Sequence, residues 1–236
     1  MKRTIRLFAI IALMIASVSA FAQKPFAGKI TFELSAEGIT DPNIAAELAE
    51  QSMEYTVMGN CSRMDMNVGI DFTTILNGNN KTSTIVLGIP GYGKYYIQQT
   101  AEDIQKAMAT VKIDFNYTGE EKTISGYKCK KVVMTQTDLE TDEESTIVLW
   151  VTSDLGLGDD INFAQYPGLK GYPLSIEQSR EINGENVKVI TTATKIVPDK
   201  KVKPTLFLLP SDAKSIDDAP EELKQMLGGL VGDDDE

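Results

Sequence analysis

The chain has 236 residues, with 23 Lys and Arg against 34 Asp and Glu, a formal net charge of -11 and no histidine. The acidic balance argues against a nucleic-acid partner, because binding to the phosphate backbone depends on clustered Lys and Arg. The lack of histidine excludes Ser-His and Cys-His catalysis and every His-ligated metal site.

Residues 1–22 have the composition of a secretory signal peptide: a basic start, an apolar run over residues 7–16 and an Ala-Phe-Ala end that predicts cleavage between Ala22 and Gln23. The alternative is a membrane span, but a span needs about 20 apolar residues. We expect a periplasmic or secreted protein without a transmembrane anchor. Removal of three basic residues and no acidic residue lowers the net charge from -11 to -14.

Apolar and polar residues alternate through most of the remaining chain, which is typical of strands with one buried face. The first two predicted strands cover residues 30–34 and 53–57, and the clearest covers residues 64–72, with Gly69 as a bend or bulge. Further strands are predicted over 82–87, 94–98, 112–117, 127–135, 146–151, 174–181 and 187–197. About ten or eleven strands without alternating helices predict an antiparallel sheet and argue against a parallel βαβ fold.

Two short amphipathic helices interrupt this pattern, over residues 43–51 and over residues 101–110, where Thr100 and Asp103 resemble a capping box. Each helix is expected to lay its apolar side on the hydrophobic face of the sheet. Residues 211–236 have a weaker helical signal and an acidic end. This stretch is predicted to be a flexible tail, with a docked peptide as the alternative.

Cys61 and Cys129 are the two cysteines of the chain, 68 positions apart. In an oxidising compartment they are a candidate disulfide, worth about 4 kcal/mol on the chain-entropy model. The alternative is a pair of buried thiols on separate strands. Two cysteines without histidine do not make a zinc site, so neither a metal nor a cofactor is predicted.

The sequence has no positive sign of catalysis. The acidic stretch over residues 138–144 does not fit a calcium loop, because Glu143 stands where glycine is needed and Leu149 where glutamate is needed. There is no glycine-rich phosphate loop and no Gly-x-Ser-x-Gly motif. We therefore expect a protein that is not an enzyme.

Residues 123–131 (Thr-Ile-Ser-Gly-Tyr-Lys-Cys-Lys-Lys) resemble the signature strand of a family of exported bacterial domains of unknown function. Residues 149–152, 168–174 and 206–210 resemble, in the same order, the tryptophan strand, the glycine-rich return and the closing Phe-x-x-Pro of that family. The resemblance covers roughly residues 25–214.

At the level of fold, this family resembles the LolA and LolB lipoprotein carriers. The resemblance implies a single LolA-like domain over residues 23–210: a half-open antiparallel β-barrel of about eleven strands, with two or three short helices in or across its concave face. Those carriers hold their lid with a cavity arginine. Arg63, the nearest candidate, lies on the polar side of its predicted strand, so this role is not carried over.

The expected function is non-enzymatic binding of a lipid, an acyl chain or a lipidated protein in the concave face, although a plain core also explains the apolar residues. The alternative is an envelope scaffold with a filled barrel that binds a protein partner. The candidate ligand-binding residues are apolar positions of the first three predicted strands and of the helix over 101–110: Ile30, Phe32, Leu34, Tyr55, Val57, Met64, Met66, Phe72, Ile104 and Met108.

Overall fold

A computed structural model describes residues 25–40, 46, 50–67, 69–182 and 185–227. The predicted signal peptide and nearly all of the helix expected over residues 43–51 lie outside this range. Within it, no helix is long and apolar enough to cross a membrane.

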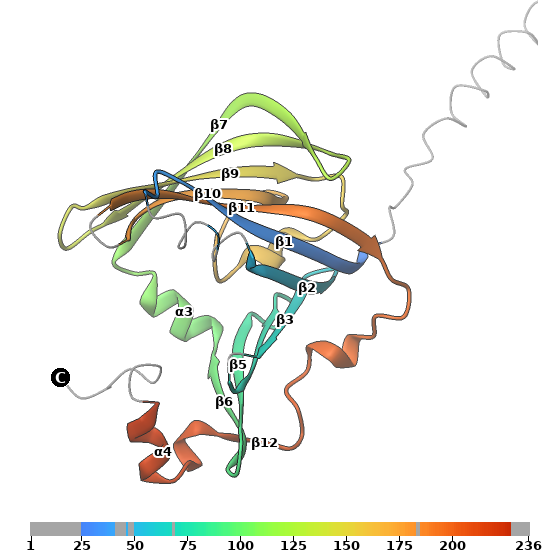
Figure 1. Ribbon diagram of the computed structural model, residues 1–236, viewed down its shortest axis with the longest axis vertical. Helices are drawn as coiled ribbons and strands as arrows, with labels where there is room; N and C mark the ends of the chain where they lie inside the picture. Colours follow the sequence, from blue (N-terminus) through green and yellow to red (C-terminus); the bar gives the residue numbers. More distant parts are fainter. Residues whose placement is uncertain (1–24, 41–45, 47–49, 68, 183–184, 228–236) are drawn as a thin grey trace, which may run out of the picture.

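One sheet of twelve strands makes up most of the molecule (Figure 1). In chain order the strands are β1 (Ala27–Glu37), β2 (Ser52–Met58), β3 (Cys61–Asn67), β4 (Asp71–Asn77), β5 (Thr82–Ile89), β6 (Gly93–Gln99), β7 (Val111–Ile124), β8 (Tyr127–Asp138), β9 (Glu144–Thr152), β10 (Tyr172–Ile182), β11 (Glu185–Pro198) and β12 (Ala213–Ser215). Their spatial order is β12-β6-β5-β4-β3-β2-β1-β11-β10-β9-β8-β7. Strands β12 and β7 form the two edges, and every pair except β12 with β6 is antiparallel. The antiparallel sheet expected from the alternation and the half-open architecture implied by the family resemblance are thus confirmed.

The sheet bends sharply near its middle. In Figure 1, strands β7 to β11 with β1 form the upper part, and β2 to β6 descend from it. The pairing of β1 with β11 shifts register between Thr31 and Phe32, and that of β10 with β9 shifts between Pro173 and Ser175. Such bulges increase local twist and bending. We call the side toward which the sheet bends the inner face.

The stretch over residues 64–72 is a hairpin and not the single strand predicted. Strand β3 ends at Asn67 and β4 begins at Asp71, and these two residues face each other in the ladder, as do Met66 and Phe72. Gly69 has a φ of 92°, which glycine adopts without strain. Met66 and Phe72 are an even number of positions apart, so apolar and polar residues continue to alternate in the same order on both sides of the turn. The sequence pattern therefore does not reveal the turn.

The structure confirms the helix predicted after Thr100. Helix α3 (Ala101–Ala107) begins with the expected capping box, in which the Thr100 hydroxyl accepts from the Asp103 backbone N–H and the Thr100 N–H donates to the Asp103 carboxylate. None of the seven helical residues is buried. The helix therefore does not lie with its apolar side against the sheet, contrary to the sequence prediction.

The C-terminal segment is docked as far as Leu227, where the sequence predicted a flexible tail. It contains the 3-10 turns η2 (Pro204–Phe207) and η3 (Ile216–Asp218) and helix α4 (Glu221–Met226). Strand β12 pairs in parallel with β6, and the buried Ile216, Leu223 and Leu227 pack against β5 and β6. Three residues of strand are too few to show an alternating pattern, which is why β12 was not predicted.

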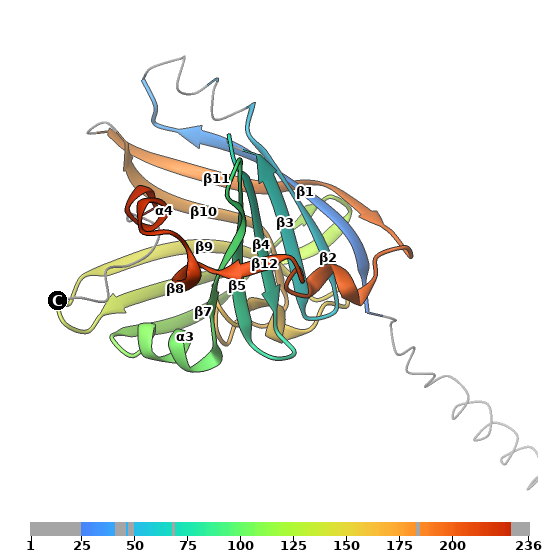
Figure 2. The same ribbon diagram turned by 90° about the horizontal axis from the view of Figure 1, so that it is seen from below.

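This segment contacts both faces of the sheet. Phe207 of η2 packs with Ile75 and Val86, whereas Leu223 of α4 packs with Leu87, the next residue along β5. Because neighbouring residues of a strand point to opposite faces, η2 and α4 cover opposite sides of the sheet. Figure 2 shows β12 between them, and this strand pairs with β6. Helix α4 lies on the inner face.

Both cysteines are free and buried, in place of the candidate disulfide. Cys61 of β3 packs with Ile75 and Phe207, and Cys129 of β8 packs in a different cluster with Ile30. Five strands lie between β3 and β8 in the sheet order, which keeps the two sulfur atoms apart. The structure corresponds to the alternative of two buried thiols.

Two reactive thiols per chain are therefore expected when the protein is denatured without a reductant and titrated with Ellman's reagent. Burial raises the pKa of both thiols, which keeps them protonated and slow to react in the native protein. The native protein should show little reaction on the same timescale. A denatured protein without reactive thiols would instead indicate a disulfide.

Candidate functional site

A cavity of about 350 Å³, here called the inner cavity, opens on the inner face of the sheet. Strands β1, β2, β10 and β11 contribute most of its wall, and the rest comes from the segment between β9 and β10 and from one residue each of β3 and β4. The lining residues are Phe32, Leu34, Met53, Tyr55, Ser62, Leu76, Ile161, Asn162, Gln165, Tyr166, Tyr172, Pro173, Ile176, Gln178, Arg180, Val189 and Thr191.

Strand register explains why these side chains meet. Phe32 lies opposite Met53, Ile176 opposite Thr191, and Gln178 opposite Val189. Directly opposed residues of an antiparallel pair point to the same face. The wall is therefore built from every second residue of neighbouring strands, because those residues point to the same face of the sheet.

Aromatic side chains stiffen one side of the cavity. The rings of Phe32 and Tyr55 pack edge to face, with centroids 5.6 Å apart and planes at 84°. This arrangement is favourable beyond the area that it buries. This side of the wall is thus a packed aromatic pair.

Three tyrosines in the lining lie close enough to influence one another. Burial raises the pKa of Tyr55, of Tyr172 and of Tyr166, the last to about 12, and the proximity of Tyr55 raises the pKa of the other two further. Among the described residues, no hydrogen bond is made by their hydroxyl groups. The phenols are therefore neutral at physiological pH and able to donate or accept a hydrogen bond from a ligand.

One end of the cavity is polar. Arg180 lies exposed there and donates from Nε and Nη2 to Oε1 of Gln178, over 3.3 and 3.0 Å. It is the one charged side chain of the described lining. The cavity thus combines a largely apolar wall with a single positive charge near its rim.

Three predicted ligand-binding residues line the inner cavity, namely Phe32, Leu34 and Tyr55. Ile30 and Val57 lie on the same strands, but both are fully buried in the core. The apolar side of β1 and β2 is therefore divided between core and cavity wall, a division that periodicity does not reveal.

The remaining predicted residues are dispersed. Met64 is buried, Met66 lines a separate pocket with Arg63, and Phe72 packs against the cluster that contains Leu223. Strands β3 and β4 border the inner cavity only near one end, through Ser62 and Leu76, and their other ends lie toward the region that α4 covers. The structure does not bring them together with Phe32 and Tyr55 around one cavity.

Ile104 and Met108, the predicted lid, line a second cavity of about 400 Å³ between α3 and residues 159–170. The 3-10 turn η1 (Asp159–Asn162) and the residues after it separate the two cavities, because Ile161 lines the first and Phe163 the second. Helix α3 is thus not a lid over the inner cavity.

Sequence reasoning missed the wall formed by residues 161–180 and by Val189 and Thr191. The strands β10 and β11 were predicted, but alternation alone does not say which of their faces lines a void. Tyr166 lies in a connection without periodicity, where no pattern marks it. The glycine-rich stretch over residues 168–174 is the nearest signal, since its Tyr172 and Pro173 belong to this wall.

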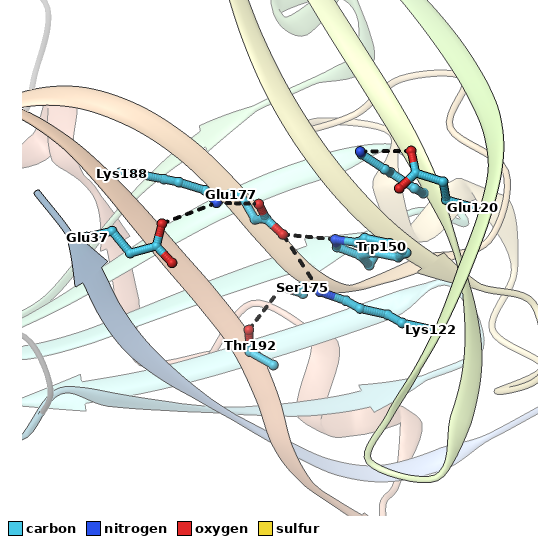
Figure 3. A network of polar contacts seen from close by, with 9 residues as sticks. Glu37, Glu120, Lys122, Trp150, Ser175, Glu177, Lys188 and Thr192 are labelled. Atoms are coloured by element: carbon cyan, nitrogen blue, oxygen red, sulfur yellow. Dashed lines mark hydrogen bonds and ion pairs between the residues drawn. The ribbon is translucent and has the colours of Figure 1, made fainter.

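A polar network lies on the other side of β10 (Figure 3). Glu177 alternates with the cavity residues Ile176 and Gln178, so it points to the opposite face. Its carboxylate accepts from Nε1 of Trp150 over 2.9 Å and pairs with Lys188 at 2.9 Å and Lys122 at 3.7 Å. The Lys122 ammonium also lies 4.1 Å from the centre of the Trp150 ring. The network joins β7, β9, β10 and β11.

The positive charges and hydrogen bonds around Glu177 together affect the pKa of its carboxyl more than burial does. Burial on its own raises the pKa of this carboxyl, but the bonds from Lys188 and Trp150 and the positive charges of Lys188 and Lys122 together lower it below its ordinary value. Each of these polar side chains has a partner, and a satisfied network of this kind holds the four strands together. The described residues contain no cluster of three or more Cys, Asp or Glu side chains placed to hold a metal ion.

Comparisons with known proteins give the fold and the family. No curated protein matches the chain. Two solved structures of PNGF-II, in space groups P21 and C2, match with TM-scores of 0.51 and 0.52 and sequence identities of 17% and 16%. Each match covers 86% of this chain but 33% of the PNGF-II chain, so the likeness shows a shared fold alone. The family described as "Domain of unknown function (DUF4412)" matches residues 36–166, more than half of the chain, and the protein therefore belongs to this family.

Proposed function

We propose that this protein is an exported, non-enzymatic binding protein that holds the apolar part of a lipid, acyl chain or lipidated partner in the inner cavity. The observation that carries the proposal is the cavity of about 350 Å³ on the inner face of the bent sheet. Small-molecule sites usually measure roughly 300–1,000 Å³. Export, to the periplasm or beyond, rests on the composition of residues 1–22.

The apolar wall supplies enough free energy for useful affinity. Burial of about ten methylene groups contributes roughly 8 kcal/mol. That is the free energy of a roughly micromolar complex, before the cost of immobilising the ligand is subtracted. The packed pair of Phe32 and Tyr55 is already formed in this structure, which supports a small reorganisation cost on that side of the wall.

The chemistry of the lining also supports binding. Its described residues offer no carboxylate, thiol or lysine amine to act as a base or nucleophile. The phenols have pKa values too high for proton transfer near neutral pH, since a general acid or base works best when its pKa is close to the working pH.

One observation favours the scaffold alternative. Helix α4 and η3 fill the inner face over β5 and β6 with the chain's own Leu223 and Ile216. A protein partner would then be bound on the outside of a closed interior. A test of ligand entry into the inner cavity distinguishes the two functions, because a scaffold that binds its partner on the outside does not need a cavity that a ligand can enter.

Val189→Trp is expected to weaken binding of the neutral fluorescent probe N-phenyl-1-naphthylamine about tenfold. Val189 is half-buried and points into the cavity, so an indole there occupies the space of at least two ligand methylenes. The measurement is the rise of probe fluorescence on titration with protein.

Ile190→Trp is the matched control, because Ile190 is the next residue of β11 and points to the opposite face. It should leave probe binding unchanged. If the wild-type protein does not bind the probe, or if both variants bind it as the wild type does, the inner cavity is not a ligand site and the scaffold function is favoured.

A further inference from the structure

The inner cavity changes in polarity along a single strand. Ile176, Gln178 and Arg180 of β10 occupy consecutive positions of its wall, so the lining passes from an aliphatic side chain through an amide to a guanidinium. Four residues of strand span about 13 Å. A ligand lying along β10 would therefore have one end in an apolar environment and the other beside a positive charge.

Arg180 has no carboxylate partner among the described residues. Its hydrogen bonds run to the neutral amide oxygen of Gln178. Arg63, the other arginine of the described chain, instead binds the Asp65 carboxylate through three hydrogen bonds of 2.7 to 3.1 Å. In a chain with an excess of acidic residues, a guanidinium without a carboxylate at the rim of an apolar cavity keeps donors available for an anion.

The positive charge is felt inside the cavity. Burial is the main reason for the raised pKa of Tyr166, and the Arg180 charge opposes part of that rise, which places the guanidinium within electrostatic reach of the phenol. Gln165 and the hydroxyl of Tyr166 lie in the same lining. The same lining that holds Arg180 therefore offers further hydrogen-bond donors.

We infer that the inner cavity takes a single-chain amphiphile with an anionic head group, such as a fatty acid or an alkyl phosphate, with its chain along the apolar wall and its head on Arg180. A guanidinium binds carboxylates and phosphates in a two-pronged geometry. The volume of about 350 Å³ is at the lower end for ligand sites, which favours one chain over two. This inference rests on the proposed function and narrows it, because the acyl amide of a lipidated protein carries no such charge.

The test is competition against bound N-phenyl-1-naphthylamine with three ligands of equal chain length: laurate, dodecyl phosphate and dodecanol. The wild-type protein is expected to bind the two anions about tenfold more tightly than the alcohol, the effect of one charge-assisted contact at a partly exposed site. Arg180→Gln should remove this preference and leave dodecanol binding unchanged. The anion that binds more tightly identifies the head group.

Lys195→Gln is the control for net charge. Lys195 is an exposed lysine of β11 outside the lining, so its loss should leave the preference intact. Equal binding of all three ligands to the wild type, or a preference that survives in Arg180→Gln, would overturn the inference while the proposed function stands. Failure of every ligand to displace the probe, or of the probe to bind, would overturn both. Arg180 is exposed, and a thermal melt monitored by circular dichroism verifies that the variant is folded.

Discussion

Leu223→Ala is expected to lower the free energy of unfolding by about 3 kcal/mol, the usual cost of truncating a fully buried leucine. Leu223 is 0% exposed and packs with Leu87, Ile89 and Tyr95 on the inner face. Helix α4 has six residues, and helices this short are not stable alone in water. Its attachment therefore depends on this side chain and its buried neighbours.

Urea unfolding followed by circular dichroism measures the effect. Leu208→Ala is the matched control, because Leu208 belongs to the same C-terminal segment but is 56% exposed, so its change should stay within about 0.5 kcal/mol. A loss below about 1 kcal/mol for Leu223→Ala would show that α4 is only loosely attached, as the sequence predicted. Because α4 lies outside the inner cavity, the folded variant should bind the fluorescent probe normally.

Glu177→Ala is expected to cost about 2 kcal/mol at neutral pH. The Glu177 side chain is 16% exposed and is the shared partner of Trp150, Lys188 and Lys122. Its removal leaves the buried indole N–H without an acceptor and removes the carboxylate that pairs with Lys122, whereas Lys188 retains its pair with Glu37 at 3.5 Å. The cost exceeds that of an ordinary surface pair, because both the indole and the carboxylate are largely withdrawn from water.

The same variant makes a prediction about pH. The pKa of Glu177 is lower in the folded protein than its ordinary value of 4.5, so its contribution to stability is present above that value and is lost as the pH falls through the folded pKa. The difference in unfolding free energy between wild type and variant should therefore narrow below about pH 4.5. Glu54→Ala serves as the control, since its pair with Lys29 is about half exposed on both sides and should contribute little. If both variants lost the same free energy of unfolding at every pH, Glu177 would not have the stabilising role proposed for it.

The sequence predicts the class of fold well because alternation directly reports which side of a strand is buried. It does not report what buries that side. Leu34 and Phe72 both stand on the apolar phase of their strands, yet one borders a cavity and the other is covered by the cluster around α4. Of the predicted ligand-binding residues, Phe32, Leu34 and Tyr55 line one cavity, and the others lie in different environments. That the three bind a ligand stays a prediction.

Two further differences between the sequence prediction and the structure have the same cause. The alternation of apolar and polar residues is a local property of the sequence, whereas packing depends on residues far apart in the chain. The turn between Met66 and Phe72 kept the phase of the alternation and was read as one strand. Arg180 stands at the end of a predicted strand as an ordinary charged residue, and only the pairing of β10 with β11 places it at the cavity. Which side chains meet at the cavity depends on how the strands pair with one another, and this pairing is not visible in the sequence of any single strand.

The pairing of β12 with β6 has a consequence for biosynthesis. Strand β6 ends at Gln99 and its outer neighbour begins at Ala213, so more than a hundred residues are translated before that edge is covered. During this interval the backbone groups of β6 are free to pair with another strand, and such edges promote aggregation of nascent chains. Completion of the sheet thus waits until residues 213–215 are available.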